Sequence, residues 1–289
     1  MNSHDIVFAL SGIWHGTYGM VRCPCHNDRT PSLQIGEGQL GVIVHCWAGC
    51  DWRTVRDALA RAGLLEPRRG ISTFNRSPSP RSPHPGKELN AERAGRIWRA
   101  SHSISGTLAA AYLELRGIAL DGLPATLRFH PALSHPANGV AYPAMVAAVT
   151  VWPSREVRAV HRTYLKADGT GKIEHLNAKA MLGPCRGGAV RLSAPGPKLA
   201  IGEGLETCLS VLAATRLPTL AALSTSGLRG IVLPDPPLAG EVLICADADA
   251  PGMKAAHEAA KAFAKQGRVV RIATPTHGKD FNDTLRGAL

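Results

Sequence analysis

The sequence predicts an α/β protein, α+β overall. It would contain a small N-terminal metal-ligand module, a linker, a mixed middle region and a C-terminal parallel sheet flanked by helices. Three observations predict this order: cysteine and histidine pairs near the start, a Pro/Ser/Arg-rich stretch after them, and alternating strand and helix patterns at the end. We expect domain bounds of 1–65, 66–88, 89–196 and 197–289.

The N-terminal module contains one clear strand and one clear helix. Residues 41–46 (Gly-Val-Ile-Val-His-Cys) form a short β-type run. Asp51 is placed to cap a helix over about 52–62, which Gly63 would end. Residues 67–85 then hold five prolines, four serines and four arginines. Such a composition buries too little apolar surface to offset ordering, and it predicts a flexible basic linker.

The middle region begins with a helical pattern and continues as strands. Residues 88–116 are alanine-rich with helical spacing, and the pattern ends at Gly117. From 127 to 192, short alternating runs between turn residues predict strands. One of these is 158–164, which is followed by the turn signal Asp168-Gly169.

The C-terminal region alternates strands and helices. Predicted strands and helices lie at 199–201, 205–214 (helix), 219–223, 241–246, 251–266 (helix) and 268–273. Such alternation favours a parallel sheet between helices. Its functional residues should follow the carboxyl ends of the strands.

Composition and charge narrow the class of protein. Of 289 residues, 45% are hydrophobic, which is enough for a sizeable core. Lys and Arg number 33 against 22 Asp and Glu, and the net charge of +11 favours a polyanionic partner, most often nucleic acid. No apolar run reaches membrane-span length, no signal peptide is evident, and seven cysteines do not suggest a disulfide framework. We therefore expect a cytoplasmic protein with no membrane partner.

Two short pairs of metal-ligating residues lie in the N-terminal module. They are Cys23-Pro24-Cys25-His26 and Cys46-Trp47-Ala48-Gly49-Cys50. Zinc takes four soft or borderline ligands in a tetrahedron, and two close pairs joined by a loop supply them. We predict one structural zinc on Cys23, His26, Cys46 and Cys50. Cys25 and His45 remain alternatives, because each lies one residue from a predicted ligand.

Acidic residues follow the predicted C-terminal strands. Glu203 closes the first strand, Asp247 and Asp249 close the third, and Asp280 and Asp283 follow the last. Carboxylates on adjacent loops suit Mg²⁺ or Mn²⁺, which can clamp the oxygens of a phosphoryl transfer. We expect Glu206 to be a carboxylate on a helix face rather than a ligand. Residues 224–227 could present backbone N–H groups to phosphate or form a plain turn.

Both motif groups resemble known families. Cys23-Pro24-x-His26, the following 28–33 and the second cysteine pair resemble the zinc-binding domain that begins bacterial and phage DNA primases. Cys46 and Cys50 enclose three residues where cellular primases usually have two, which is closer to the phage and plasmid branch. Residues 197–289, with their acidic motifs in order, resemble the Toprim domain of primases, topoisomerases and some nucleases. Segments 112–118 and 161–165 are also similar to phage and plasmid primase-like proteins.

The resemblance implies roles for individual residues. Glu203 matches the Toprim glutamate, a metal ligand and general acid/base, and Asp247 and Asp249 match its metal-binding pair. Asp280 and Asp283 match a late acidic motif, also assigned here to the metal. Single-stranded DNA contacts are expected from Arg22, Arg29 and Trp47, although Trp47 could instead cover the metal site. Phosphate contacts are predicted for Arg162, Lys166, Lys172, Lys254 and Lys279, with ordinary solvated charge as the alternative.

Together the resemblances imply a DNA primase that makes short RNA primers on single-stranded DNA during replication of a phage, plasmid or mobile element. It would bind one structural Zn²⁺ and use Mg²⁺ or Mn²⁺ in catalysis. Its substrates would be ribonucleoside triphosphates. A separate helicase chain is expected, because no Gly-x-x-x-x-Gly-Lys-Ser/Thr stretch occurs. The alternatives are a Toprim-type nuclease and a non-catalytic accessory protein that binds single-stranded DNA.

Overall fold

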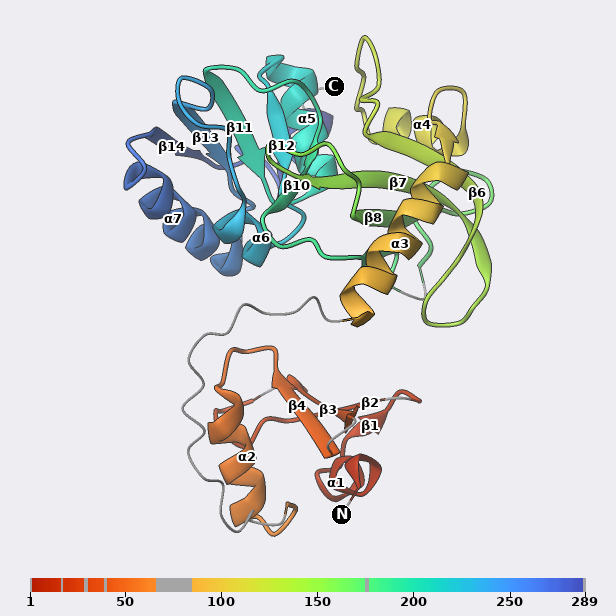
Figure 1. Cartoon of the computed structure of the whole chain (residues 1–289), viewed down its shortest axis with the longest axis vertical. Coiled ribbons are helices and arrows are strands. Elements are labelled where there is room, and N and C mark those ends of the chain that lie inside the picture. Colours follow the sequence, from red (N-terminus) through yellow and green to blue (C-terminus); the bar gives the residue numbers. More distant parts are fainter. Residues whose placement is uncertain are drawn as a thin grey trace. The chain divides into compact units, whose positions relative to one another are not determined.

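The computed structural model describes residues 2–16, 18–28, 31–38, 41–65, 85–174 and 177–287. Arg29 and nearly all of the predicted linker lie outside these ranges. The chain divides into two compact units, residues 1–79 and 80–289 (Figure 1). No helix in the described ranges is both long and apolar enough to cross a membrane.

The first unit is a four-stranded antiparallel sheet with two helices. Its elements are α1 (Ser3–Ala9), β1 (Ile13–Trp14), β2 (Tyr18–Val21), β3 (Leu33–Gly38), β4 (Gly41–Cys46) and α2 (Trp52–Arg61). The strands pair in chain order. The predicted strand 41–46 is confirmed, and so is the cap of the following helix, because Asp51 accepts a hydrogen bond from the Arg53 N–H at 2.9 Å.

The core of this unit is small and lies between the helices and one face of the sheet. Ile6 of α1 and Leu59 of α2 are fully buried with Leu33 and Ile35 of β3. Successive residues of a strand face opposite sides, so Cys46 is buried while His45 is exposed. The register pairs Cys46 with Leu33, which brings the second cysteine pair beside the end of β3.

The second unit begins with two helices rather than the continuous helical stretch predicted over 88–116. Its first elements are α3 (Pro85–Ala100), β5 (His102–Ser103) and α4 (Leu108–Leu115). The break has a local cause: the Ser101 hydroxyl bonds back to the Ile97 carbonyl at 2.8 Å, and Gly106 takes a φ of +69°. Helix α3 also starts inside the predicted linker, at a proline, which suits a first helical position.

The strands predicted between 127 and 192 are present. They are β6 (Leu127–Ser134), β7 (Ala141–Val151), β8 (Ala159–Tyr164), β9 (Lys179–Leu182) and β10 (Gly188–Arg191). All pair antiparallel.

The C-terminal elements follow the predicted alternation. They are β11 (Lys198–Gly202), α5 (Leu205–Thr215), β12 (Thr219–Ala221), α6 (Thr225–Gly230), β13 (Glu241–Cys245), α7 (Ala250–Ala264), β14 (Val269–Ala273) and α8 (Phe281–Gly287). The four strands are parallel in the order β14-β13-β11-β12, which confirms the predicted parallel sheet. Ala200 packs with α5 and α8, whereas its neighbours Leu199 and Ile201 pack with α6 and α7, so helices cover both faces (Figure 1).

Strand β10 joins the middle region to the C-terminal sheet. It pairs antiparallel with β12 on one side and with β7 on the other, which makes one ten-stranded sheet. A continuous sheet gives the middle region a fixed position relative to the carboxyl ends of β11 and β13. Side chains of both regions can therefore contribute to one site.

The C-terminal sheet allows a matched test of its core. Val242 in β13 is 2% exposed and Val269 in neighbouring β14 is 57% exposed. We predict that Val242→Ala lowers the free energy of unfolding by about 2 kcal/mol, because it removes buried methyl groups and leaves a cavity. Val269→Ala should change it by less than about 0.5 kcal/mol. Urea denaturation measures both free energies. Equal losses for the two variants would contradict the assignment of Val242 to the buried core and of Val269 to the surface.

Candidate functional site

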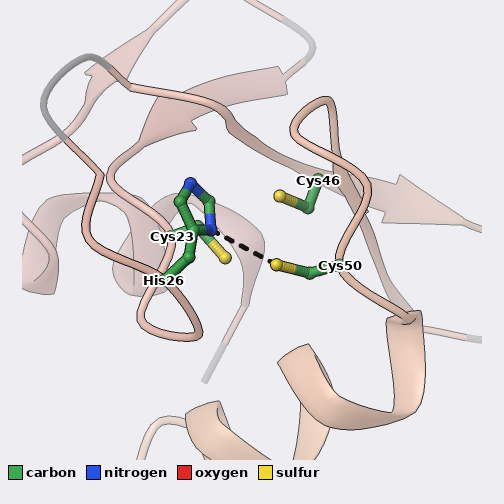
Figure 2. A group of neighbouring side chains, drawn as sticks. All are labelled: Cys23, His26, Cys46 and Cys50. Carbon is green, nitrogen blue, oxygen red and sulfur yellow. Dashed lines mark hydrogen bonds between the residues drawn. The ribbon is translucent and has the colours of Figure 1, made fainter. Parts of the chain in front are cut away.

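Four side chains from two loops converge in the first unit. Cys23 and His26 follow β2, Cys46 ends β4, and Cys50 precedes α2 (Figure 2). Their ligand atoms all lie within 4.8 Å of one another, and His26 Nδ1 is 3.2 Å from Cys50 Sγ. Three thiols and one imidazole at this spacing form a zinc-like site. Cys25 and His45 are not members of the group.

Asp28 organises the loop that carries the first ligand pair. Its carboxylate accepts hydrogen bonds from the Cys23 N–H at 2.7 Å and from the Ser32 hydroxyl at 2.6 Å. It also lies 3.5 Å from His26 Nε2, the ring nitrogen that does not face Cys50. A carboxylate behind a histidine ligand fixes the ring's orientation and tautomer. These hydrogen bonds, chiefly the one from Ser32, lower the pKa of Asp28 to about 2.

The thiols have different proton affinities. Burial raises the pKa of Cys23 to about 12. Burial also acts on Cys46, but backbone N–H groups of Cys50 and Ala48 outweigh it and lower that pKa to about 7. Cys46 is thus the thiol most easily deprotonated to a metal-binding thiolate.

A second cluster lies at the carboxyl ends of the parallel strands. The register pairs Gly202 of β11 with Cys245 of β13, so Glu203, one residue on, and Asp247, two residues on, lie at the same edge of the sheet. Thr207, in the first turn of α5, donates to Asp247 Oδ1 at 3.3 Å. Asp249 caps α7 by accepting from the Gly252 N–H at 2.7 Å. A side chain at Gly252 would meet Asp249 Oδ1 at 2.9 Å, which explains the glycine.

The loop after β14 reaches the same edge. The Ala248 N–H donates to the Lys279 carbonyl at 2.9 Å, which ties this loop to the Asp247–Asp249 turn. Asp280 accepts from the Asp283 N–H at 2.9 Å, and Asp283 accepts from the Lys279 N–H at 2.9 Å. The Asp283 carboxylate therefore stabilises the conformation of this loop through a hydrogen bond within it.

Burial and the neighbouring acidic residues shift the pKa values of Glu203 and Asp247. Burial raises the pKa of Glu203, and the nearby Asp247 and Asp249 raise it further. Burial likewise raises the pKa of Asp247, followed by repulsion from Asp280. The backbone N–H of Thr225, at the start of α6, acts in the opposite direction on Glu203. Like charges held together in this way favour a bound cation.

The carboxylates do not form a closed cage. Among the residues that the structure describes, only the Cys/His group brings three or more ligand atoms close together. Mg²⁺ usually keeps several waters and binds through one or two carboxylates plus substrate phosphates. The open arrangement of Glu203, Asp247 and Asp249 fits that requirement.

Sequence reasoning missed the surroundings of Glu206. We expected a helix-face carboxylate, but Glu206 is 4% exposed. It accepts from Tyr112 Oη at 3.0 Å, Lys179 Nζ at 2.7 Å and Lys172 Nζ at 3.4 Å. The only sequence signal was the three-residue spacing from Glu203. The partners come from distant segments that only the fold brings together.

The residues predicted to contact nucleic acid differ in their exposure to solvent and in their side-chain partners. Arg22, Trp47, Lys254 and Lys279 are exposed. The Trp47 ring packs edge-on against His45, with the ring centroids 4.5 Å apart, and donates to Gln34 Oε1 at 3.2 Å. Lys166 pairs with Glu174. Arg162 is a correction: it is 6% exposed and donates to Tyr164 and to the Met181 carbonyl, so it is not available to a polyanion.

Two family matches cover most of the second unit. Residues 198–289 match the Toprim domain family, and residues 88–192 match a family described as a domain of unknown function, DUF7146. The chain therefore carries a Toprim domain at its C-terminal end, as its acidic motifs predicted. No curated protein matches the chain.

Several solved structures of primases are similar to the chain, with low sequence identity and low TM-scores. The zinc-binding and RNA polymerase domains of Aquifex aeolicus primase show 15% identity and a TM-score of 0.41, over 98% of this chain and 80% of that one. The primase fragment of the bacteriophage T7 primase-helicase shows 13% and 0.41, over 96% of both chains. A Pseudomonas aeruginosa DNA primase domain shows 16% and 0.40, over 70% and 75%.

The metal ligands can be tested by removing single thiols. We predict that the purified chain holds one zinc ion and that Cys46→Ser loses it, because three ligands hold zinc far less tightly than four. Cys25→Ser should retain it, since Cys25 lies outside the group. Elemental analysis after dialysis measures the content. Zinc loss from Cys25→Ser alone would contradict the ligand set.

The raised pKa of Asp247 predicts a stability effect. The Asp247 carboxyl keeps its proton to a higher pH in the folded chain than in the unfolded chain. The ionised carboxylate therefore destabilises the fold. This cost in free energy disappears as pH falls through the folded pKa. Without divalent metal at pH 7, Asp247→Asn should raise the free energy of unfolding by about 1 kcal/mol. The exposed Asp235 gives the control Asp235→Asn. Urea denaturation measures both, and destabilisation by Asp247→Asn would refute the electrostatic account.

Proposed function

We propose that the chain is a primase-like nucleotidyltransferase that synthesises short RNA primers on single-stranded DNA in the replication of a phage, plasmid or mobile element. The observation that carries this proposal is the placement of Glu203, Asp247 and Asp249 at one edge of a parallel sheet within the Toprim domain. The zinc-like site in the same chain supports it, because a metal-binding module joined to a Toprim domain is the combination that primases use.

The chemistry follows from the charges at the sheet edge. The primer 3′-hydroxyl attacks the α-phosphorus of an incoming nucleoside triphosphate, a new P–O bond forms, and pyrophosphate leaves. Bound Mg²⁺ or Mn²⁺ would supply charge stabilisation to the attacking and leaving oxygens. Glu203 is the residue to take the hydroxyl proton, because its raised pKa makes it a stronger base than an ordinary glutamate. Asp247 and Asp249 would hold the metal.

The first unit would hold the template. Its exposed Arg22 and Trp47 offer a charge for the phosphate backbone and a ring on which a base can stack. The net charge of +11 supports a nucleic-acid partner for the whole chain. The zinc would act by stabilising a small core rather than in the reaction. A helicase would be a separate chain.

A labelled-nucleotide assay on single-stranded DNA with Mg²⁺ or Mn²⁺ tests the proposal. We expect short RNA products, and we expect Asp247→Asn to reduce their rate of formation by about a hundredfold or more, since charge neutralisation at the reacting phosphate is lost. Asp235→Asn is the control and should leave the rate unchanged.

The products separate the primase from its rivals. Shortened template without new strands would replace the proposal with a Toprim-type nuclease. Binding of DNA with neither synthesis nor cleavage would favour a non-catalytic accessory protein.

A further inference from the structure

Glu206 is a buried carboxylate whose partners come from the middle region. It lies in the first turn of α5, while Tyr112 belongs to α4, Lys179 begins β9 and Lys172 precedes it. The side chain of Glu206 is 5% exposed, against 32% for Lys172 and 42% for Lys179. Both lysines therefore reach from the solvent side to a carboxylate in the interior.

This arrangement leaves donors on the ammonium groups. An ammonium has three N–H donors, and Glu206 accepts one from each lysine, at 3.4 Å and 2.7 Å. Within the described part of the chain, these are the only hydrogen bonds that the two ammonium groups make. Burial alone would raise the pKa of Glu206, but Lys179 and Lys172 outweigh it and hold the pKa well below its usual range. Glu206 is thus ionised, and its single charge is matched by two positive ones.

The pair of lysines lies beside the carboxylate cluster. Glu203 and Glu206 are three residues apart, and Thr207, next to Glu206, donates to Asp247. Lys179 lowers the pKa of both Glu203 and Asp247, which places its charge within reach of both. An anion bound by a metal on those carboxylates would therefore meet this ammonium group as well.

We propose that Glu206 is a positioning residue: it holds Lys172 and Lys179 so that their unused N–H donors bind the phosphate groups of a nucleoside triphosphate beside the carboxylate cluster. This inference rests on the proposed function for the identity of the anion. The physical reason for a buried anchor is entropy. A lysine on a flexible four-carbon stem loses rotamer freedom when it binds phosphate, and an ion pair that already fixes it removes part of that loss.

Binding of ATP and of adenosine to the full-length chain, each with Mg²⁺, tests the inference by calorimetry. Lys179→Met should raise the Kd for ATP about tenfold, because a charge-assisted hydrogen bond is lost, and Glu206→Gln about threefold to fivefold. Lys179→Arg should restore most of the affinity. None of these changes should alter the Kd for adenosine, which has no phosphate.

Two controls separate positioning from folding. Lys198 pairs with Glu241 at the opposite end of β11, and Lys198→Met should leave ATP binding unchanged. In a chain that already carries Lys172→Met and Lys179→Met, Glu206→Gln should have no further effect on ATP binding. An equal effect in both backgrounds, or equal losses for ATP and adenosine, would overturn the inference. If Glu206→Gln prevents folding, the two Lys179 variants decide, and unchanged ATP binding by Lys179→Met would overturn it.

The same measurements distinguish this inference from the proposed function. The predicted ATP pattern in a chain that makes no primers would sustain the phosphate site and reject primer synthesis. Primer synthesis with unchanged Kd and KM for nucleotides in Glu206→Gln and Lys179→Met would sustain the proposed function and reject the phosphate site.

Discussion

The parallel pairing of β11 with β13 decides where the acidic residues of the Toprim domain lie. Because Gly202 and Cys245 are register partners, Glu203 and Asp247 must follow at one edge of the sheet. That position is half-buried and close to other acidic residues, so burial first, and then repulsion by these neighbours, raises the pKa of both carboxylates. The fold accepts the repulsion because buried apolar residues on both faces of the sheet hold the strands in place.

The structure balances this charge with groups from several elements. Thr207 donates to Asp247, and Gly252 donates to Asp249. Lys179, whose positive charge lowers the pKa of both Glu203 and Asp247, belongs to the middle region rather than to the Toprim segment. Continuity of the sheet through β10 makes this possible. The region matching a domain of unknown function thus supplies charged side chains to the edge of the Toprim carboxylates.

The first unit has a different constraint, which is its small core. Its buried residues come from two short helices and one face of a four-stranded sheet. Cys23 and Cys46 belong to that same core, so the metal ligands and the apolar residues stabilise one another. Asp28 adds a hydrogen-bonded loop behind His26. A metal bound there would contribute directly to the free energy of folding.

The sequence by itself predicted most of the elements and the members of the zinc-like site, because periodicity, caps and ligand spacing are local properties. It predicted the parallel sheet and the convergence of Cys23, His26, Cys46 and Cys50, and strand alternation explains why His45 is excluded. Only the tertiary structure decided that Arg162 is buried and that Glu206 meets Lys179. Those outcomes depend on which segments pack together across long sequence separations, and no local pattern carries that information.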